Sequence, residues 1–136
     1  MIYGLDTSIV LRLLTGEPEA LSLQAVHRVT ALQAGGHSFI ISDLVAAETY
    51  YALQFHYKMP KQEALAALVL LGQGKSGIRS SGACEAVLKI PHLASINPGF
   101  VDRLIHADYQ RAGHTMLTCE TAAKKLVGVE VVSERA

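Results

Sequence analysis

Short apolar runs along the chain alternate with longer segments in which apolar residues recur every three or four positions. A short run bounded by turn residues predicts a buried strand, and the longer spacing predicts an amphipathic helix. The expected strands are residues 2–5, 38–41, a segment near Ile78, 114–118 and 129–132. The expected helices are residues 7–14, 19–34, 43–57, 61–71, 84–89, 98–111 and a short segment at 120–126.

Strands that alternate with helices predict an α/β fold. This order builds a mostly parallel sheet, because each helical segment carries the chain back to the start of the next strand. We expect a central, mostly parallel sheet of four or five strands, with helices on both faces. The chain contains no linker, repeat or low-complexity stretch, so residues 1–136 are expected to form one domain.

The composition favours a soluble, cytoplasmic protein. Half of the residues are hydrophobic, yet no apolar run reaches the roughly 18 residues that a membrane span needs. The N-terminal segment lacks the basic start and cleavage pattern of a signal peptide. Cys84 and Cys119 have no CxxC spacing, and we expect both to be reduced thiols.

Charge and hydropathy bear on the partners of the protein. Twelve basic and twelve acidic residues give a net charge of zero, so a positive surface for nucleic acid would have to be local. The mean hydropathy is positive, which predicts apolar surface covered by a dimer or another partner.

Four acidic residues form the candidate site. Asp6 closes the first expected strand and Glu120 follows the strand at 114–118, whereas Glu48 and Asp102 lie in expected helices. Groups at the carboxyl ends of parallel strands converge at one edge of the sheet. Carboxylates that are partly buried without basic partners are costly, and a shared divalent cation relieves that cost.

Four segments in register resemble the PIN-domain family, and specifically its VapC-type toxins. The first is a hydrophobic strand that ends in Asp-Thr-Ser, and the second is a strand leading into a helix with an acidic residue. The third is an Asp followed by an apolar helix, and the fourth is a strand followed by Thr-x-acid. These segments are residues 2–8, 41–48, 100–107 and 113–120.

The resemblance implies a Mg²⁺- or Mn²⁺-dependent endoribonuclease, paired with a small antitoxin and assembled as a homodimer through residues 44–71. It implies Asp6 and Asp102 as direct metal ligands, with Glu48 and Glu120 as outer ligands or water-orienting groups. The hydroxyl groups of Thr7, Ser8 and Thr118 would bind the carboxylates or the phosphate. Two positions depart from the family pattern: Glu120 stands where Asp is usual, and Cys119 stands where Phe is common.

Ordinary roles and other functions compete with this interpretation. Asp6 can simply cap a helix, and Asp102 can complement a helix dipole. A PIN-like module that binds RNA or protein without cutting is the main alternative. A haloacid-dehalogenase-type phosphatase would need Asp where Ser8 stands, and an RNase H-like enzyme would begin with several antiparallel strands. The glycine spacing at Gly72, Gly74 and Gly77 predicts a turn, since it follows a helical run rather than a strand.

Overall fold

A computed structural model describes residues 1–73 and 77–132 of the protein. The turn expected around Gly74 falls partly outside these described residues. The described strands are β1 (Ile2–Gly4), β2 (Ser38–Ile41), β3 (Arg79–Ser80), β4 (Met116–Thr118) and β5 (Val129–Val131). The described helices are α1 (Thr7–Thr15), α2 (Glu19–Ala34), α3 (Asp43–Phe55), α4 (Lys61–Gln73), α5 (Cys84–Leu88), α6 (Phe100–Arg111) and the 3₁₀ helix η1 (Thr121–Lys125).

Local capping explains where several helices begin and end. The Asp6 carboxylate accepts a hydrogen bond from the Ile9 backbone N–H at 3.2 Å and so caps α1. Ser42 caps α3 in the same way through the Val45 N–H. Gly16 ends α1 in the left-handed conformation (φ 70°), which glycine adopts without steric cost. The helices therefore start close to the ends of β1 and β2.

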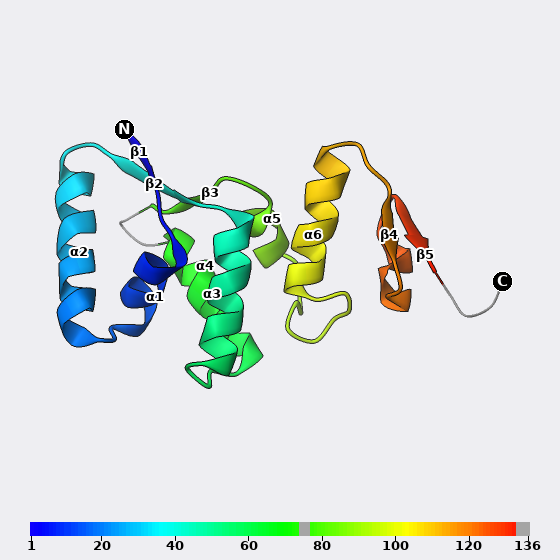
Figure 1. The fold of residues 1–136 in the computed structure, drawn as a ribbon, viewed down its shortest axis with the longest axis horizontal. Helices are drawn as coiled ribbons and strands as arrows, with labels where there is room; N and C mark the ends of the chain where they lie inside the picture. Colours follow the sequence, from blue (N-terminus) through cyan, green and yellow to red (C-terminus); the bar gives the residue numbers. More distant parts are fainter. Residues whose placement is uncertain (74–76, 133–136) are drawn as a thin grey trace.

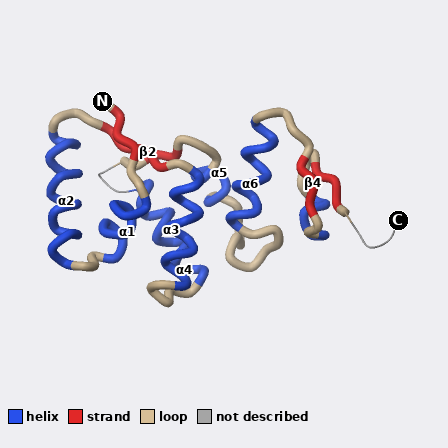
Figure 2. The backbone as a smooth tube through the Cα atoms, in the orientation of Figure 1, coloured by secondary structure: helices blue, strands red, loops and turns tan. Residues whose placement is uncertain are grey.

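The described strands form two separate parallel sheets. β2 lies between β1 and β3, with Tyr3 opposite Phe39 and Ile40 opposite Arg79. Within residues 1–73 and 77–132, β4 pairs only with β5, with Leu117 opposite Glu130. The strand segments and the parallel direction agree with the sequence-based expectation. The single central sheet of four or five strands is not what the structure has, because no pairing joins β1 to β4 in the described residues (Figure 2).

Helices α1 to α4 lie on one side of the three-stranded sheet (Figure 1). Phe39 and Ile41 of β2 point into the core on that side and are buried, whereas Ile2 of β1 is 67% exposed. The expected helical cover of both faces is therefore missing at β1 among the described residues. The core beneath the sheet is apolar and includes Val10, Phe39, Ala46, Leu53, Leu68 and Phe100.

Helix α6 separates the two sheets. It packs on α3 and α5, and the ring of Phe100 meets that of Tyr50 with centroids 5.1 Å apart. β4 contacts α6, and the β4–β5 unit lies at the end of the molecule opposite α2 (Figure 1). His106 of α6 is buried, and its Nε2 lies 2.6 Å from the Val127 carbonyl oxygen just before β5. The second sheet is thus fastened to α6 rather than to β1.

No described helix is both long and apolar enough to cross a lipid bilayer.

Candidate functional site

Asp6 and Glu48 form the first pair of acidic residues. Asp6 stands between β1 and α1, and its Oδ1 accepts a hydrogen bond from Ser8 Oγ at 2.6 Å. The adjacent Thr7 donates a hydrogen bond from Oγ1 to Oε1 of Glu48 on α3. Two carboxylates that are 42 positions apart in the sequence are thereby held at the carboxyl end of β1.

The hydrogen bonds around Asp6 favour its ionised form. The side chain of Ser8 lowers the pKa of the Asp6 carboxyl group from its ordinary value, and the Ile9 backbone N–H lowers it further. Both groups donate to the charged carboxylate, which outweighs the opposite effect of burial. Asp6 is therefore anionic at neutral pH and available to bind a cation. Ser8, which the sequence predicted as a supporting residue, performs that part of its role here.

Asp102 and Glu120 form the second pair. Both side chains line one pocket of about 220 Å³ between α6 and β4, together with the Thr118 side chain. Thr118 Oγ1 accepts a hydrogen bond from the Glu120 backbone N–H at 3.0 Å. Thr118 therefore sets the direction in which the chain leaves β4 and carries Glu120 to the pocket.

The two pairs do not meet within one chain. β1 and β4, whose ends carry Asp6 and Glu120, lie on opposite sides of α6 (Figure 1). In residues 1–73 and 77–132, no three Asp, Glu, His or Cys side chains are grouped so that they could hold one metal ion. The sequence predicted one four-carboxylate cluster, and the structure brings its members together two by two.

All four carboxylates are exposed, whereas from the sequence we expected them to be partly buried and to need a cation for that reason. The exposed residues are Asp6, Glu48, Asp102 and Glu120. An exposed carboxylate keeps its hydration, so it needs no cation to offset a cost of burial. None of the four takes part in an ion pair among the described residues. Their negative charge therefore remains available to a ligand.

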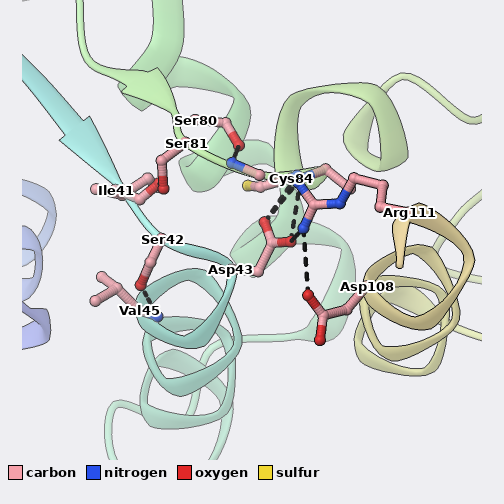
Figure 3. A network of polar contacts seen from close by, with 11 residues as sticks. Ile41, Ser42, Asp43, Val45, Ser80, Ser81, Cys84, Asp108 and Arg111 are labelled. Carbon is pink, nitrogen blue, oxygen red and sulfur yellow. Dashed lines mark hydrogen bonds and ion pairs between the residues drawn. The ribbon is translucent and has the colours of Figure 1, made fainter. Parts of the chain in front are cut away.

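Asp43 is a further acidic residue at a strand end, and it follows Ser42, the residue that caps α3. Its carboxylate instead accepts hydrogen bonds from the backbone N–H groups of Ala83 (3.1 Å) and Cys84 (3.0 Å) at the start of α5 (Figure 3). Arg111 Nη2 of α6 lies 3.6 Å from Asp43 Oδ2 and 3.4 Å from Asp108 Oδ1. Asp43 thus joins α3, α5 and α6, and its oxygens are already occupied by these partners.

Basic side chains could attract a phosphate toward the acidic pairs. Arg79 forms an ion pair with Glu85 at 3.0 Å. Lys124 and Lys125 are exposed on η1, which follows Glu120 directly. Glu120 is therefore followed in the sequence by a short helix that carries exposed positive charge.

No protein-family model, curated protein or solved structure matches the chain.

Proposed function

We propose that the protein is a metal-dependent endoribonuclease with a PIN-type fold, the toxin of a VapC-type toxin–antitoxin pair, which hydrolyses RNA phosphodiester bonds with Mg²⁺ or Mn²⁺. One observation carries the proposal: acidic residues far apart in the sequence are paired in space. Thr7 connects the Asp6 turn to Glu48, and Asp102 shares a pocket with Glu120. If these four carboxylates served only as helix caps or solvated surface groups, there would be no reason for them to lie in pairs.

The donor atoms suit a hard divalent cation. Mg²⁺ binds oxygen ligands and commonly keeps several waters beside one or two carboxylates. Among the described residues, the carboxylate oxygens of each pair form no ion pair that would compete with a cation. In the same part of a single chain, however, no three ligand side chains lie close enough together to hold one metal ion. A divalent cation bound there would stabilise charge on the phosphate and make a bound water more acidic. We propose a full site only where both pairs meet, which would also join β1 to β4 in one central sheet.

The residues beside the carboxylates have defined parts in this proposal. Ser8 keeps Asp6 ionised, and Thr7 orients Glu48. The Thr118 hydroxyl group positions Glu120 by accepting a hydrogen bond from the Glu120 backbone N–H. Lys124 and Lys125 on η1 would attract the RNA phosphates toward the second pair.

Partners are also part of the proposal. Leu44, Tyr51 and Phe55 are 83%, 47% and 68% exposed on α3, where the sequence predicts the homodimer surface. An antitoxin would cover apolar surface of this kind and place a basic side chain against the acidic pairs. Charge and apolar area together favour a protein partner over a fully solvated surface.

Cleavage of a mixed RNA pool tests the proposal. We expect wild-type protein to cut RNA with Mn²⁺ and to stop cutting with a chelator. Asp6→Asn should lower the cleavage rate by about 100-fold or more, since even the loss of an outer partner of a metal ligand costs 10–100-fold. Glu120→Asp restores the residue usual in the resembled family and should raise the rate. Asp108→Asn changes an exposed carboxylate whose one ion-pair partner in the described part of the chain is Arg111, so it is the matched control.

The outcomes separate catalysis from binding. RNA that stays intact with wild-type protein and Mn²⁺ would contradict the nuclease proposal. Retained RNA binding in that case would favour the alternative, a PIN-like binding module. Equal loss of cleavage in Asp108→Asn and Asp6→Asn would show that the effect of Asp6→Asn reflects stability rather than the site.

A further inference from the structure

β1 and β4 are both edge strands of parallel sheets, and each leaves one side unpaired in the described residues. Parallel sheets are normally larger than two strands and covered on both faces, and an unpaired edge readily accepts another strand. A two-stranded parallel sheet such as β4–β5 has little stability of its own. Both edges are therefore available for pairing.

The backbone hydrogen bonds of the two sheets identify the groups that lie on each free edge. Ser38 donates to the Met1 carbonyl and Leu5 donates to the Ile40 carbonyl, so the odd-numbered residues of β1 face β2. Backbone groups alternate sides along a strand, which leaves those of Ile2 and Gly4 facing away from β2. In β4, the Met116 N–H and the Thr118 carbonyl form hydrogen bonds on the β5 side, so the backbone N–H and carbonyl of Leu117 face away from β5.

These directions define a register in which the two edges match. If Leu117 lies opposite Tyr3, its N–H reaches the Ile2 carbonyl and its carbonyl receives the Gly4 N–H. Three residues of each strand are then aligned, as in the pairings observed for β1–β2 and β4–β5. Three positions beyond Tyr3 and Leu117, Asp6 comes opposite Glu120.

The same register matches the faces of the two sheets. Met116, Leu117 and Thr118 all line the pocket beside α6, but Met116 and Thr118 are half-buried whereas Leu117 is exposed, so α6 covers the face of β4 that carries Met116 and Thr118. Met116 would lie beside Ile2, whose face is exposed, and α6 would thus cover the bare face of β1. Leu117, 64% exposed, would join the opposite face beside Tyr3, which packs against the apolar core. Two exposed apolar side chains become covered without any change within either sheet.

The second strand must come from another molecule. In each chain α6 is docked on α3 and α5, with β4 on its far side, so a chain's own β4 cannot reach its β1 while α6 stays in place (Figure 1). We infer that β4 of one copy pairs with β1 of a second copy, and reciprocally, to give a dimer with two sheets in the order β3-β2-β1-β4-β5. This is the exchange of an element between identical chains.

The dimer would complete the acidic site. Asp6 and Glu48 of one copy would face Asp102 and Glu120 of the other, since the last two already share a pocket. Adjacent strands are roughly 5 Å apart, which is close enough for the two strand-end carboxylates to share one cation. This second step rests on the proposed nuclease function, whereas the strand pairing does not.

Disulfide trapping tests the strand pairing by itself. Two versions of the chain, both with Cys119→Ser, are co-expressed with different tags, one carrying Ile2→Cys and the other Met116→Cys. We expect a disulfide-linked species of twice the chain mass, because the two positions are opposite in the register. The control pairs Ile2→Cys with Glu130→Cys on β5, one strand further away, at roughly 10 Å from β1 and beyond disulfide reach.

Equal crosslinking of both pairs, or none of the first, would overturn the inference. The wild-type chain must also have the mass of a dimer by light scattering. A chain carrying both Ile2→Cys and Met116→Cys that forms its disulfide internally, as a monomer, would show that β4 closes on its own β1 instead.

Complementation tests the shared site. Asp6→Asn and Asp102→Asn chains are assayed for RNA cleavage alone and after co-expression. In random dimers, half are mixed and each mixed dimer has one intact site of two, so co-expression should recover about a quarter of wild-type activity. An active wild type without recovery would overturn the shared site. Crosslinking with an inactive wild type would keep the strand pairing and reject the nuclease.

Discussion

Gly82 lies so close to the carboxylate of Asp43 that a larger side chain has no room there. A Cβ atom at this position would stand 2.5 Å from Oδ2 and 2.7 Å from Oδ1 and Cγ. Asp43 cannot simply move, because its oxygens hold the N–H groups of Ala83 and Cys84. We therefore expect Gly82→Ala to lower the free energy of unfolding by about 1–3 kcal/mol, the usual cost of overpacking.

Urea unfolding followed by circular dichroism measures this change. Gly72→Ala is the matched control, because its Cβ would meet nothing nearer than the Ile78 carbonyl oxygen at 3.6 Å. Gly72 lies within α4, where alanine is favoured over glycine by about 0.5–1 kcal/mol, so this variant should be slightly more stable. An unchanged midpoint for Gly82→Ala would contradict the role assigned to Asp43.

Asp6 and Asp43 show how far residue roles could be predicted from sequence. Both follow a strand and precede a helix, and the patterns around them are nearly alike. Asp6 does cap its own helix, as one alternative reading expected. Asp43 caps α5 instead, 40 positions away, and leaves its own helix to Ser42. Contacts over such separations leave no local pattern, so the sequence could not assign Asp43.

Among the elements, the helices and strands were predictable and the strand partners were not. Apolar periodicity and capping residues act locally, and β2 has the predicted bounds, Ser38–Ile41. Strand pairing depends on where distant segments dock, and here α6 holds β4–β5 away from β1. The predicted cluster included the pairing of Asp6 with Glu48 and of Asp102 with Glu120. The separation of the two pairs within one chain was not predicted.

Helix α5 offers a test of how firmly an element is docked. Its first residue, Cys84, is 2% exposed, and burial raises the pKa of its thiol to about 12, with smaller contributions from the negative charges of Asp43 and Glu85. Cys119 is exposed. At pH 8 we expect a thiol reagent to label Cys119 quickly and Cys84 only when α5 opens or the protein unfolds. Rapid labelling of both thiols in native protein would contradict this docking.

The raised pKa also fixes a pH dependence. In the unfolded chain the Cys84 thiol ionises near its ordinary pKa of 9.0, whereas the folded protein keeps its proton until about pH 12. Between these values the folded state binds more protons, so stability falls as pH rises, by at most about 1.4 kcal/mol per pH unit. Burial also raises the pKa of Tyr50. The comparison is therefore with Cys84→Ala, which keeps Tyr50 and should lose stability less steeply above pH 9.

For the whole molecule, the question is what covers its apolar surface. Ile2 and Leu117 are 67% and 64% exposed on the two free strand edges, and Leu44 and Phe55 are exposed on α3. The first set is explained by strand exchange between two copies, and the second is the surface proposed for the homodimer and the antitoxin. Both surfaces would make stability depend on protein concentration, so a variant must tell them apart.

Leu117→Glu separates these two surfaces. In a lone chain the new charge is solvated and should change stability little, but in the exchanged dimer it would be buried beside Tyr3 without a basic partner. We expect the wild-type Tm to rise by about 2–4 °C for each tenfold increase in concentration. If strand exchange holds the two copies together, Leu117→Glu should abolish this rise and give a monomer by light scattering, whereas a dimer held through α3 would keep both the rise and the dimer mass. Val127→Glu, at a side chain 73% exposed but away from the β4 edge, should behave as wild type. A Leu117→Glu protein that stays dimeric would place the dimer contact elsewhere, because a buried, unpaired carboxylate on that edge would not be tolerated.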